Sequence, residues 1–437
     1  MKKSCHSSKT AEERMDVGAP SLLTMAAFTL DVTPPVGATM AFGVNKGTAS
    51  PIYIRGILLD DGRVRNVLIS CDFLYIWGQA WQTWRGRIAE AASTMKERVF
   101  LHCVHQHDSM RIVAHEDMEA PGSLRADLSY GEATLEKLVA AVRDAVEGEW
   151  KSIARLMTAE RRMDQLASNR RLIGGDGKWF ATRYSMCADP TLRALPVGTI
   201  DPLLRTVAFG DEAGRILAAI HFYATHPMTA YGREMVCADV PGAALEYAGE
   251  KIGAETFQMY FTGCSGNVTL GKYYLDDKEE SLRMMGRRLG DGMVSNIVHL
   301  EERPLSALSF REVSFEFPFD FNEQEGNRLG DAKRFLARNI EKWRRAFLYR
   351  LSLGDRVHIL SFPSEVVVEY QLYAQALAPE HFVACASHGD STYFYLPTAW
   401  MFKEGGYEPS VSLATPEIEE RLKTAIAEIL TTNHNHA

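Results

Sequence analysis

The chain has 437 residues, of which 46% are hydrophobic and 24% are charged, and its formal net charge at pH 7 is -8. This composition is ordinary for a folded globular protein and argues against wholesale disorder or a fibrous architecture. A net negative chain without a basic stripe has little with which to replace the counterions of nucleic-acid phosphates. Nucleic acid is therefore not expected as a partner.

The cysteines and the N-terminus bear on the cellular compartment. The seven cysteines are scattered without a CxxC pair, which argues against a Cys-rich zinc site, and their odd number leaves at least one thiol unpaired. Met1-Lys2-Lys3 could begin a signal peptide, but residues 6–16 are polar and charged where an apolar stretch is required. We therefore expect a cytoplasmic protein with free thiols, in which residues 1–20 form a flexible tail and residues 21–437 form one domain.

Short apolar runs along the chain predict a series of strands. In order, they are 21–30, 52–59, 66–76, 99–104, 204–209, 216–223, 256–261 and 357–362. The first run is about half as long as a membrane span, so no transmembrane segment is expected. The glycines and polar residues at 210–214 predict a hairpin turn.

Apolar residues at helical spacing predict helices around 135–146 and 282–297, and Thr415-Pro416 predicts the first residues of a helix reaching about residue 430. No repeat, low-complexity tract or linker divides the chain. We expect an α/β fold in which mixed β-sheets are flanked by helices within a single large domain.

The first candidate site residues are His105 and His107, in the sequence His105-Gln106-His107-Asp108 directly after the strand predicted over 99–104. Two histidines separated by one residue lie on the same side of a chain that stays extended, so both could bind one metal ion. A hydrogen-bonded polar histidine near the surface is the alternative interpretation. The pattern alone leaves both open.

Two further candidates also follow predicted strands. His226 comes after the strand over 216–223, whereas His221 lies inside that strand and is expected to be a hydrogen-bonded core residue. Glu365 follows the strand over 357–362; Ser364 is predicted to cap a helix over 366–377 and to place Glu365 in its first turn. Taken alone, Glu365 fits an ordinary glutamate that favours a helix start. Two imidazoles and a carboxylate at strand ends would, however, form the open three-ligand site of a hydrolytic zinc.

These segments occur in an order that resembles the neutral/alkaline (non-lysosomal) ceramidase family, and the resemblance covers nearly the whole chain. The matching segments are Asp31-Val32-Thr33-Pro34-Pro35-Val36-Gly37, His105-Gln106-His107, Ser168-Asn169-Arg170, Ala224-Thr225-His226-Pro227, Cys237-Ala238-Asp239-Val240-Pro241-Gly242, Gly266-Asn267-Val268-Thr269, Pro363-Ser364-Glu365, Tyr395-Leu396-Pro397-Thr398 and Gly405-Gly406-Tyr407-Glu408. Each motif is weakly specific, and their fixed order is the stronger signal.

The resemblance implies a set of residues around a Zn²⁺ ion, namely His105, His226, Glu365 and Tyr395. It also implies that His107 is the general base and that Tyr407 helps to stabilise the oxyanion. Arg170, rather than the adjacent Arg171, would border the pocket, and Thr269 stands where the family often has an active-site serine.

The sequence departs from the family pattern at three places. Asp108-Ser109-Met110 follows the histidine pair where the family has Ser-Gly-Pro, so that Asp108 could orient His107 or favour a polar substrate. Thr269 replaces the serine, which leaves a hydroxyl there. The sequence stops about 30 residues after Tyr407, so we expect the catalytic domain without the C-terminal β-sandwich domain of larger members.

The resemblance therefore predicts a zinc-dependent amidase that cleaves an N-acyl linkage in a small-molecule or lipid-like substrate, with a role in lipid metabolism. A zinc hydrolase of an ester or another carbonyl linkage is the first alternative, because the same water attack serves both. A non-catalytic family member that only binds a ligand is the second.

Overall fold

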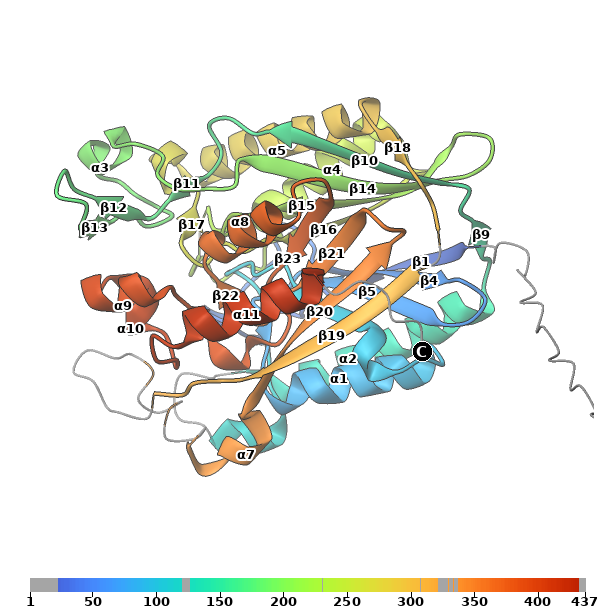
Figure 1. Ribbon diagram of the computed structural model, residues 1–437, viewed down its shortest axis with the longest axis horizontal. Coiled ribbons are helices and arrows are strands. Elements are labelled where there is room, and N and C mark those ends of the chain that lie inside the picture. The colour runs from blue at the N-terminus through green and yellow to red at the C-terminus, as the bar shows by residue number, and fades with distance from the viewer. Residues whose placement is uncertain are drawn as a thin grey trace, which may run out of the picture.

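The computed structural model describes residues 23–431 apart from 120–125, 230, 307, 321–328, 330–332 and 334–336 (Figure 1). The tail predicted over residues 1–20 lies outside the described residues. Within the described part of the chain, no helix combines the length and apolar character needed to cross a bilayer.

Three larger mixed sheets form the framework of the described residues (Figure 1). The N-terminal sheet has the strand order β7 (Val99–Cys103), β5 (Arg65–Cys71), β4 (Tyr53–Asp60), β1 (Thr24–Asp31) and β9 (Lys151–Ser152). The central sheet has the order β16 (Phe257–Thr262), β15 (Ile216–Tyr223), β14 (Leu203–Gly210), β10 (Arg155–Arg162) and β18 (Glu301–Arg303). The C-terminal sheet has the order β19 (Leu308–Glu316), β20 (Arg345–Leu353), β21 (Val357–Ser361) and β23 (Phe382–Ala386).

Two-stranded pairs connect and extend these sheets. They are β2 (Thr39–Met40) with β3 (Gly43–Val44), β6 (Tyr75–Ile76) with β8 (Arg111–Ile112), β11 (Ser168–Asn169) with β17 (Val268–Thr269), β12 (Arg171–Ile173) with β13 (Trp179–Thr182), and β22 (Glu365–Val366) with β24 (Tyr395–Leu396).

The predicted strands are found near their expected positions. β15 has the predicted limits, and it pairs antiparallel with β14 across the predicted turn, where Gly214 has a φ of 83° that glycine adopts without strain. The run over 66–76 is two strands, β5 and β6, rather than one. The amide of Asp72 in the gap donates to the carbonyl of Tyr53, so the chain stays attached to β4 there.

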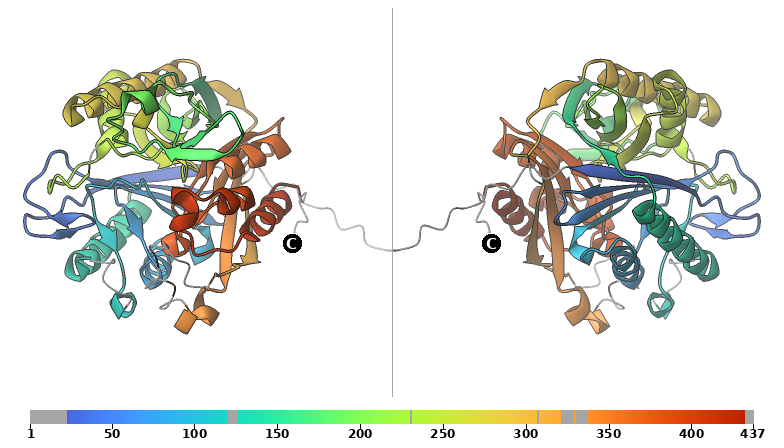
Figure 2. Two further views of the ribbon diagram at one scale, coloured as in Figure 1. Left: turned by 90° about the vertical axis from the view of Figure 1, so that its left-hand side faces the viewer. Right: turned by 90° about the vertical axis from the view of Figure 1, so that its right-hand side faces the viewer.

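Helices cover the sheets on three different sides (Figure 2). α1 (Gln79–Ala91) and α2 (Leu128–Glu147) pack on the N-terminal sheet, α4 (Asp239–Ile252) and α5 (Lys278–Val298) on the central sheet, and α8 (Val368–Leu377) and α11 (Ile418–Thr431) on the C-terminal sheet. Shorter α-helices are α3 (Pro190–Ala194), α7 (Ile340–Trp343), α9 (Ala399–Glu404) and α10 (Tyr407–Ser410), and 3₁₀ turns are η1 (Lys96–Arg98), η2 (His115–Glu119), η3 (Gly271–Tyr273) and η4 (Ser391–Tyr393).

The helices expected around 135–146 and 282–297 are α2 and α5. The prediction that Thr415 caps the last helix is wrong, because α11 begins only at Ile418. The Thr415 hydroxyl has no hydrogen-bond partner, and its amide donates to the carbonyl of Pro318 instead. A contact distant in sequence therefore delays the start of this helix.

Each large sheet contains one parallel strand pair: β5–β7, β15–β16 and β21–β23. Hydrogen bonds join these pairs in the interior. The Ser70 hydroxyl donates to the Tyr260 carbonyl (2.6 Å), the Thr262 hydroxyl donates to the Val104 carbonyl (2.7 Å), and the Ser387 amide donates to the Thr262 carbonyl (2.8 Å). The carboxyl ends of strands from three sheets are thereby brought to one region of the molecule.

The cysteines within the described residues are unpaired and buried: Cys71, Cys103, Cys187, Cys237, Cys264 and Cys385. Even Cys71 and Cys103, which lie opposite each other in the β5–β7 pair, are not bonded. This agrees with the expectation of free thiols, while Cys5 lies outside the described residues.

Candidate metal centre

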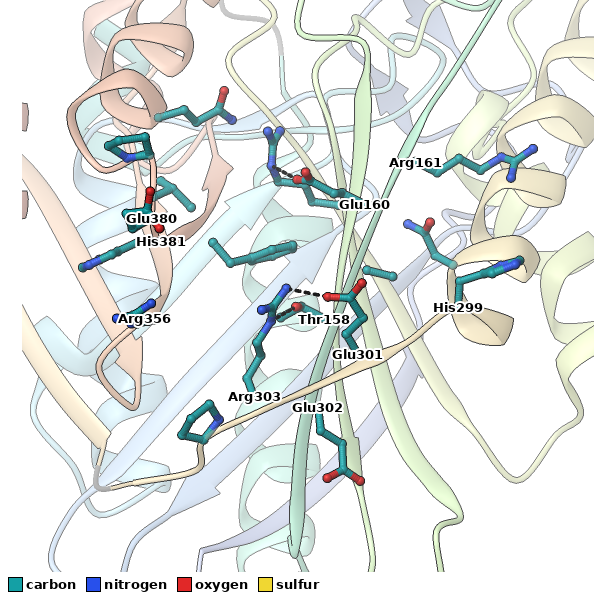
Figure 3. Close-up of a pocket in the computed structure, with 18 of the residues that line it drawn as sticks. Thr158, Glu160, Arg161, His299, Glu301, Glu302, Arg303, Arg356, Glu380 and His381 are labelled. Carbon is teal, nitrogen blue, oxygen red and sulfur yellow. Dashed lines mark hydrogen bonds and ion pairs between the residues drawn. The ribbon is translucent and has the colours of Figure 1, made fainter.

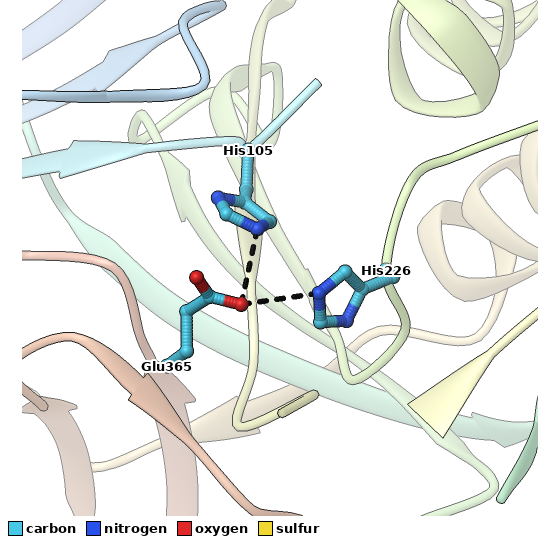
Figure 4. A group of neighbouring side chains, drawn as sticks. All are labelled: His105, His226 and Glu365. Atoms are coloured by element: carbon cyan, nitrogen blue, oxygen red, sulfur yellow. Dashed lines mark hydrogen bonds and ion pairs between the residues drawn. The ribbon is translucent and has the colours of Figure 1, made fainter. Parts of the chain in front are cut away.

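His105, His226 and Glu365 meet at the ends of strands from the three sheets (Figure 4). His105 follows β7, His226 follows β15, and Glu365 follows β21 and opens β22. We call these three residues the cluster. Their backbones are fixed by neighbours: the amide of His105 donates to Phe73, that of His226 to Val268 and that of Glu365 to Phe394.

The prediction that Ser364 caps a helix is wrong. α8 begins at Val368 with Val367 as its N-cap, and Glu365 pairs in parallel with Tyr395 in the β22–β24 strand pair. Ser364 has a φ of 56°, and its hydroxyl donates to the carbonyl of Asp390 (2.6 Å). This left-handed residue turns the chain after β21, so that Glu365 faces the two histidines.

The spacing of the donor atoms in the cluster is that of metal ligands. The Oε2 atom of Glu365 lies 3.3 Å from the Nε2 atom of His105 and 3.2 Å from the Nε2 atom of His226 (Figure 4). Two donor atoms that each lie about 2.0–2.1 Å from one tetrahedral zinc ion are about 3.3 Å apart. The Glu365 oxygen therefore lies at ligand spacing from both nitrogens, and the three donor atoms all lie within 4.8 Å of one another.

The orientation of the imidazoles makes the case stronger. The Nδ1 atom of His105 is 2.8 Å from the Leu74 carbonyl, and that of His226 is 2.7 Å from the Ser265 carbonyl. A carbonyl only accepts, so each Nδ1 carries a proton. Burial, with a smaller effect of the Arg170 charge, lowers the pKa of His226 to about 4, so this ring has no second proton near neutral pH. Its Nε2 lone pair then faces the carboxylate oxygen of Glu365, and a cation between the two removes the repulsion.

The donor set fits zinc, because two imidazoles and one carboxylate are common ligands of a hydrolytic zinc. The phenol oxygen of Tyr395 lies 3.1 Å from the Nε2 atom of His226, at a fourth corner of the cluster. Burial, followed by the charge of Glu365, raises the pKa of Tyr395, so its hydroxyl is protonated.

His107 lies beside the cluster rather than within it. His105 has a φ of 75°, which turns the chain, so the prediction that both histidines share one side of an extended chain is wrong. The His107 ring centroid is 4.9 Å from that of His105 and 5.9 Å from that of His226. Its Nδ1 atom donates to the carbonyl of His105 (3.1 Å), and burial lowers its pKa well below the ordinary value. The Nε2 atom of His107 is thus left as a proton acceptor.

Of the two adjacent arginines, Arg170 faces the cluster and Arg171 does not. A terminal nitrogen of Arg170 lies 3.4 Å from the Tyr395 hydroxyl, and its guanidinium lies 4.9 Å from the centroid of Tyr407. The Tyr407 ring in turn lies 5.4 Å from that of Tyr395. Arg171 instead binds the buried carboxylate of Glu408 (2.8 Å). The structure therefore gathers Arg170, Tyr395 and Tyr407 around one side of the cluster.

Thr269 and Asp108 are engaged elsewhere. The Thr269 hydroxyl lies 3.4 Å from the carbonyl of Arg183, and none of the contacts within the described part of the chain joins it to the cluster. The carboxylate of Asp108 accepts from the amide of Gly232 (2.7 Å) and from the side chain of Arg233 (2.8 Å). Asp108 therefore fixes the loop after His226 and does not orient His107.

The sequence analysis missed one residue of this region, His388. Its side chain is fully buried, and its ring lies 4.1 Å from the His105 ring with an angle of 15° between the planes. The signal was present in the sequence, because His388 follows the strand β23 as His105 follows β7. His221, by contrast, is a buried core residue with its Nδ1 atom 2.9 Å from the Thr206 hydroxyl, as expected.

A cavity of about 930 Å³ lies away from the cluster, between the β10–β18 edge and the start of β23 (Figure 3). Its charged residues are mostly paired across the cavity wall. Arg303 donates to Thr158 (2.7 Å) and to Glu301 (3.0 Å), and Arg205 contacts Glu160 (3.3 Å) (Figure 3). Since none of the cluster residues lines it, this cavity is not the candidate site.

Comparison with known proteins shows which solved structures share this fold. No protein-family model matches the sequence, and no curated protein matches it. Among solved structures, the chain is similar to a ceramidase complexed with C2, with a TM-score of 0.73 and 15% identity over 94% of this chain and 75% of that chain. It is similar to the neutral ceramidase of Pseudomonas aeruginosa with a TM-score of 0.73 and 14% identity over 94% and 74% of the two chains. The chain therefore has a neutral-ceramidase-like α/β fold, as predicted.

Proposed function

We propose that the protein is a zinc-dependent hydrolase that cleaves N-acyl (amide) linkages in a small-molecule or lipid-like substrate. The observation that carries the proposal is the convergence of two Nε2 atoms and a carboxylate oxygen, while both Nδ1 protons are bound by backbone carbonyls. The likeness in fold to neutral ceramidases supports the same reaction class and a place in lipid metabolism.

The ion would be held by His105, His226 and Glu365, with Tyr395 at the fourth corner. A zinc ion in such a site makes a water molecule nucleophilic near neutral pH and polarises a carbonyl oxygen. The protein orients the two imidazoles, because the carbonyls of Leu74 and Ser265 accept their Nδ1 protons and direct the Nε2 atoms toward Glu365. These two carbonyls therefore fix the orientation of both rings before an ion binds.

In the proposed reaction His107 would accept the proton of the attacking water and return it to the leaving amine. Its Nδ1 proton is held by the His105 carbonyl, which leaves Nε2 free of a proton, and its lowered pKa keeps the ring neutral. Arg170 and Tyr407 lie together on the Tyr395 side of the cluster, and there they would stabilise the negative charge that develops on the carbonyl oxygen.

Hydrolysis of an ester is the nearest alternative reaction, since the same groups would serve it. A protein that only binds its ligand is the alternative without catalysis, and the placement of His107 beside the cluster argues against it. The free, buried cysteines are consistent with the cytoplasmic location that we propose.

The test combines metal content with turnover. Protein purified without added metal should contain about one zinc per chain and should hydrolyse short N-acyl amides faster than the matched esters. His105→Ala should lose zinc and activity together, because a ligand is removed. His107→Ala should keep its zinc yet lose turnover by about a hundredfold or more, which is the usual effect of removing a general base. Zinc-loaded protein that hydrolyses neither class of substrate would contradict the proposal and would favour a protein that only binds its ligand.

A further inference from the structure

Glu408 is a fully buried carboxylate that lies between two buried arginines, and the proposed reaction does not yet use it. Its Oε2 atom accepts a hydrogen bond from the Nη1 atom of Arg171 (2.8 Å), and its Oε1 atom lies 3.5 Å from the Nε atom of Arg170 in an ion pair. All three side chains belong to residues that are at most 4% exposed. A buried charge needs an opposite charge beside it, so Glu408 allows both guanidinium groups to stay inside the protein.

The contact with Glu408 determines how Arg170 is oriented. The Nε atom of Arg170 faces Glu408, while its Nη2 atom lies 3.4 Å from the Tyr395 hydroxyl and also donates to the Gly266 carbonyl. A guanidinium group is planar and rigid, so a partner at one nitrogen sets the direction of the other two. The carboxylate therefore controls how the charge of Arg170 is presented to the cluster.

The same contacts reach Tyr407, the residue that precedes Glu408 at the start of α10. The Arg170 guanidinium lies 4.9 Å from the centroid of the Tyr407 ring. The Nη1 atom of Arg171, which binds Glu408, also donates to the Gly405 carbonyl (2.9 Å) in the turn before α10. One carboxylate thus connects the two groups that would stabilise the negative charge of the proposed reaction.

We infer that Glu408 is a positioning residue, which holds Arg170 and Tyr407 in the arrangement that stabilises the oxyanion. The inference rests on the proposed function. Because Glu408 is fully buried, it acts through Arg170 and contacts no substrate itself. Its negative charge also offsets part of the positive charge of Arg170, which by itself would weaken the attraction for an oxyanion. The test must therefore separate the position of the carboxylate from its charge.

The neighbouring acidic residue Glu404 allows a matched pair of variants. Glu408→Asp keeps the charge but draws the carboxylate back by one methylene group, so it changes the position alone. Glu404→Asp makes the same change in a carboxylate that lies 3.6 Å from Arg171 and accepts from the Trp179 amide (3.3 Å). Among the contacts of the described residues, none joins Glu404 to Arg170, which makes Glu404→Asp the control.

The experiment uses zinc-loaded, full-length protein and methylphosphonate, a tetrahedral anion that imitates the oxyanion. Calorimetry measures the dissociation constant for methylphosphonate without turnover, and steady-state kinetics give kcat and KM for a short N-acyl amide. We expect Glu408→Asp to raise the dissociation constant and to lower kcat, each by about tenfold, with KM nearly unchanged, because the oxyanion forms only in the transition state. Glu404→Asp should match the parent within about twofold, and zinc content should be equal in all variants.

The same substitution in an Arg170→Met background tests whether Glu408 acts through Arg170. There, Glu408→Asp should cause no further loss of methylphosphonate binding or of kcat, because the side chain that it positions is absent. A merely structural role would give the same loss in both backgrounds and would overturn the inference.

Glu408→Gln is a second variant, which covers the case that Glu408→Asp does not fold. Its amide oxygen can accept from only one of the two guanidinium groups, so we expect a similar loss. Tighter binding of methylphosphonate by Glu408→Gln would mean that Glu408 only offsets charge, and parent-like behaviour of Glu408→Asp would mean that its position is unimportant; either result overturns the inference alone. A zinc-loaded parent that hydrolyses no amide or ester would refute the proposed function and this inference together, so the two failures can be told apart.

Discussion

The molecule gathers histidines in two regions, and the two differ in how their nitrogens are used. Beside the large cavity, the Nδ1 atom of His358 is 2.9 Å from the Ser352 hydroxyl and its Nε2 atom is 2.8 Å from His381. At the cluster, the Nε2 atoms of His105 and His226 face a carboxylate. In the first group the ring nitrogens bind a hydroxyl and each other, whereas in the second they converge on a carboxylate at the spacing of metal ligands.

Volume and charge alone would favour the wrong region. The cavity near His381 has about 930 Å³ and is lined by many ionisable side chains. Arg161, Arg205 and Arg303, however, bind nearby carboxylates or hydroxyls, which leaves their charges less able to attract a ligand. A functional site is marked by convergent polar atoms that lack partners.

The largest difference should appear when one imidazole is removed from the cluster and, as a control, one is removed beside the large cavity. His226→Ala should lose zinc and reduce kcat/KM by about a hundredfold or more, because a ligand is lost. His381→Ala, the control from the other group, should keep both within about twofold. Metal analysis and steady-state kinetics on the same preparations give the answer. Equal zinc content in the two variants would contradict the assignment of the metal site to the cluster.

A second prediction concerns the metal-free protein. Glu365→Gln should raise its free energy of unfolding by about 1–3 kcal/mol, because the glutamine amide can donate to the Nε2 atom of His226 and an ionised carboxylate cannot. Urea unfolding of chelator-treated parent and variant measures the difference. The same variant should bind zinc more weakly than the parent. A variant that is less stable than the metal-free parent would show that Glu365 is satisfied without an ion.

The smallest effect concerns a histidine with both nitrogens bonded, His102. Burial is the main cause that lowers its pKa to about 4. The unfolded chain binds a proton at its ordinary pKa of about 6.5, so the stabilising effect of neutral His102 is present above that pH and is lost as the pH falls toward 4. His102→Gln carries no such proton. Between about pH 7 and about pH 5.5, metal-free parent should lose about 1 kcal/mol more stability than His102→Gln, as measured by urea unfolding. Parallel pH profiles would contradict this.

Much of the framework follows from local patterns in the sequence. The apolar run over 216–223 has the limits of β15, and the glycines around residue 214 form the predicted turn. His105 and His226 could be singled out because each directly follows or closely trails such a strand. These features depend on residues that are neighbours in the chain, which is the range over which propensity and periodicity act.

The errors come from contacts between distant segments. Ser364 has the residue type of a helix cap, yet the pairing of Glu365 with Tyr395, thirty positions later, decides its conformation. Asp108 follows His107 directly, but its carboxylate is bound by Arg233, which lies far along the chain between β15 and α4. His388 was passed over because a lone histidine before glycine carries no motif, although its place after β23 is the same signal that identified His105.

The origin of the cluster in three sheets has a consequence for how the chain matures during synthesis. The ribosome delivers β7 with His105 first and β15 with His226 next, while Glu365 and Tyr395 emerge much later. A domain forms its long-range pairs only once both partners are available. The nascent chain therefore exposes two imidazoles long before their carboxylate arrives, and it can hold an ion tightly only after the β22–β24 pair has closed. Uptake of the proposed metal ion should accordingly be one of the last steps in making this protein.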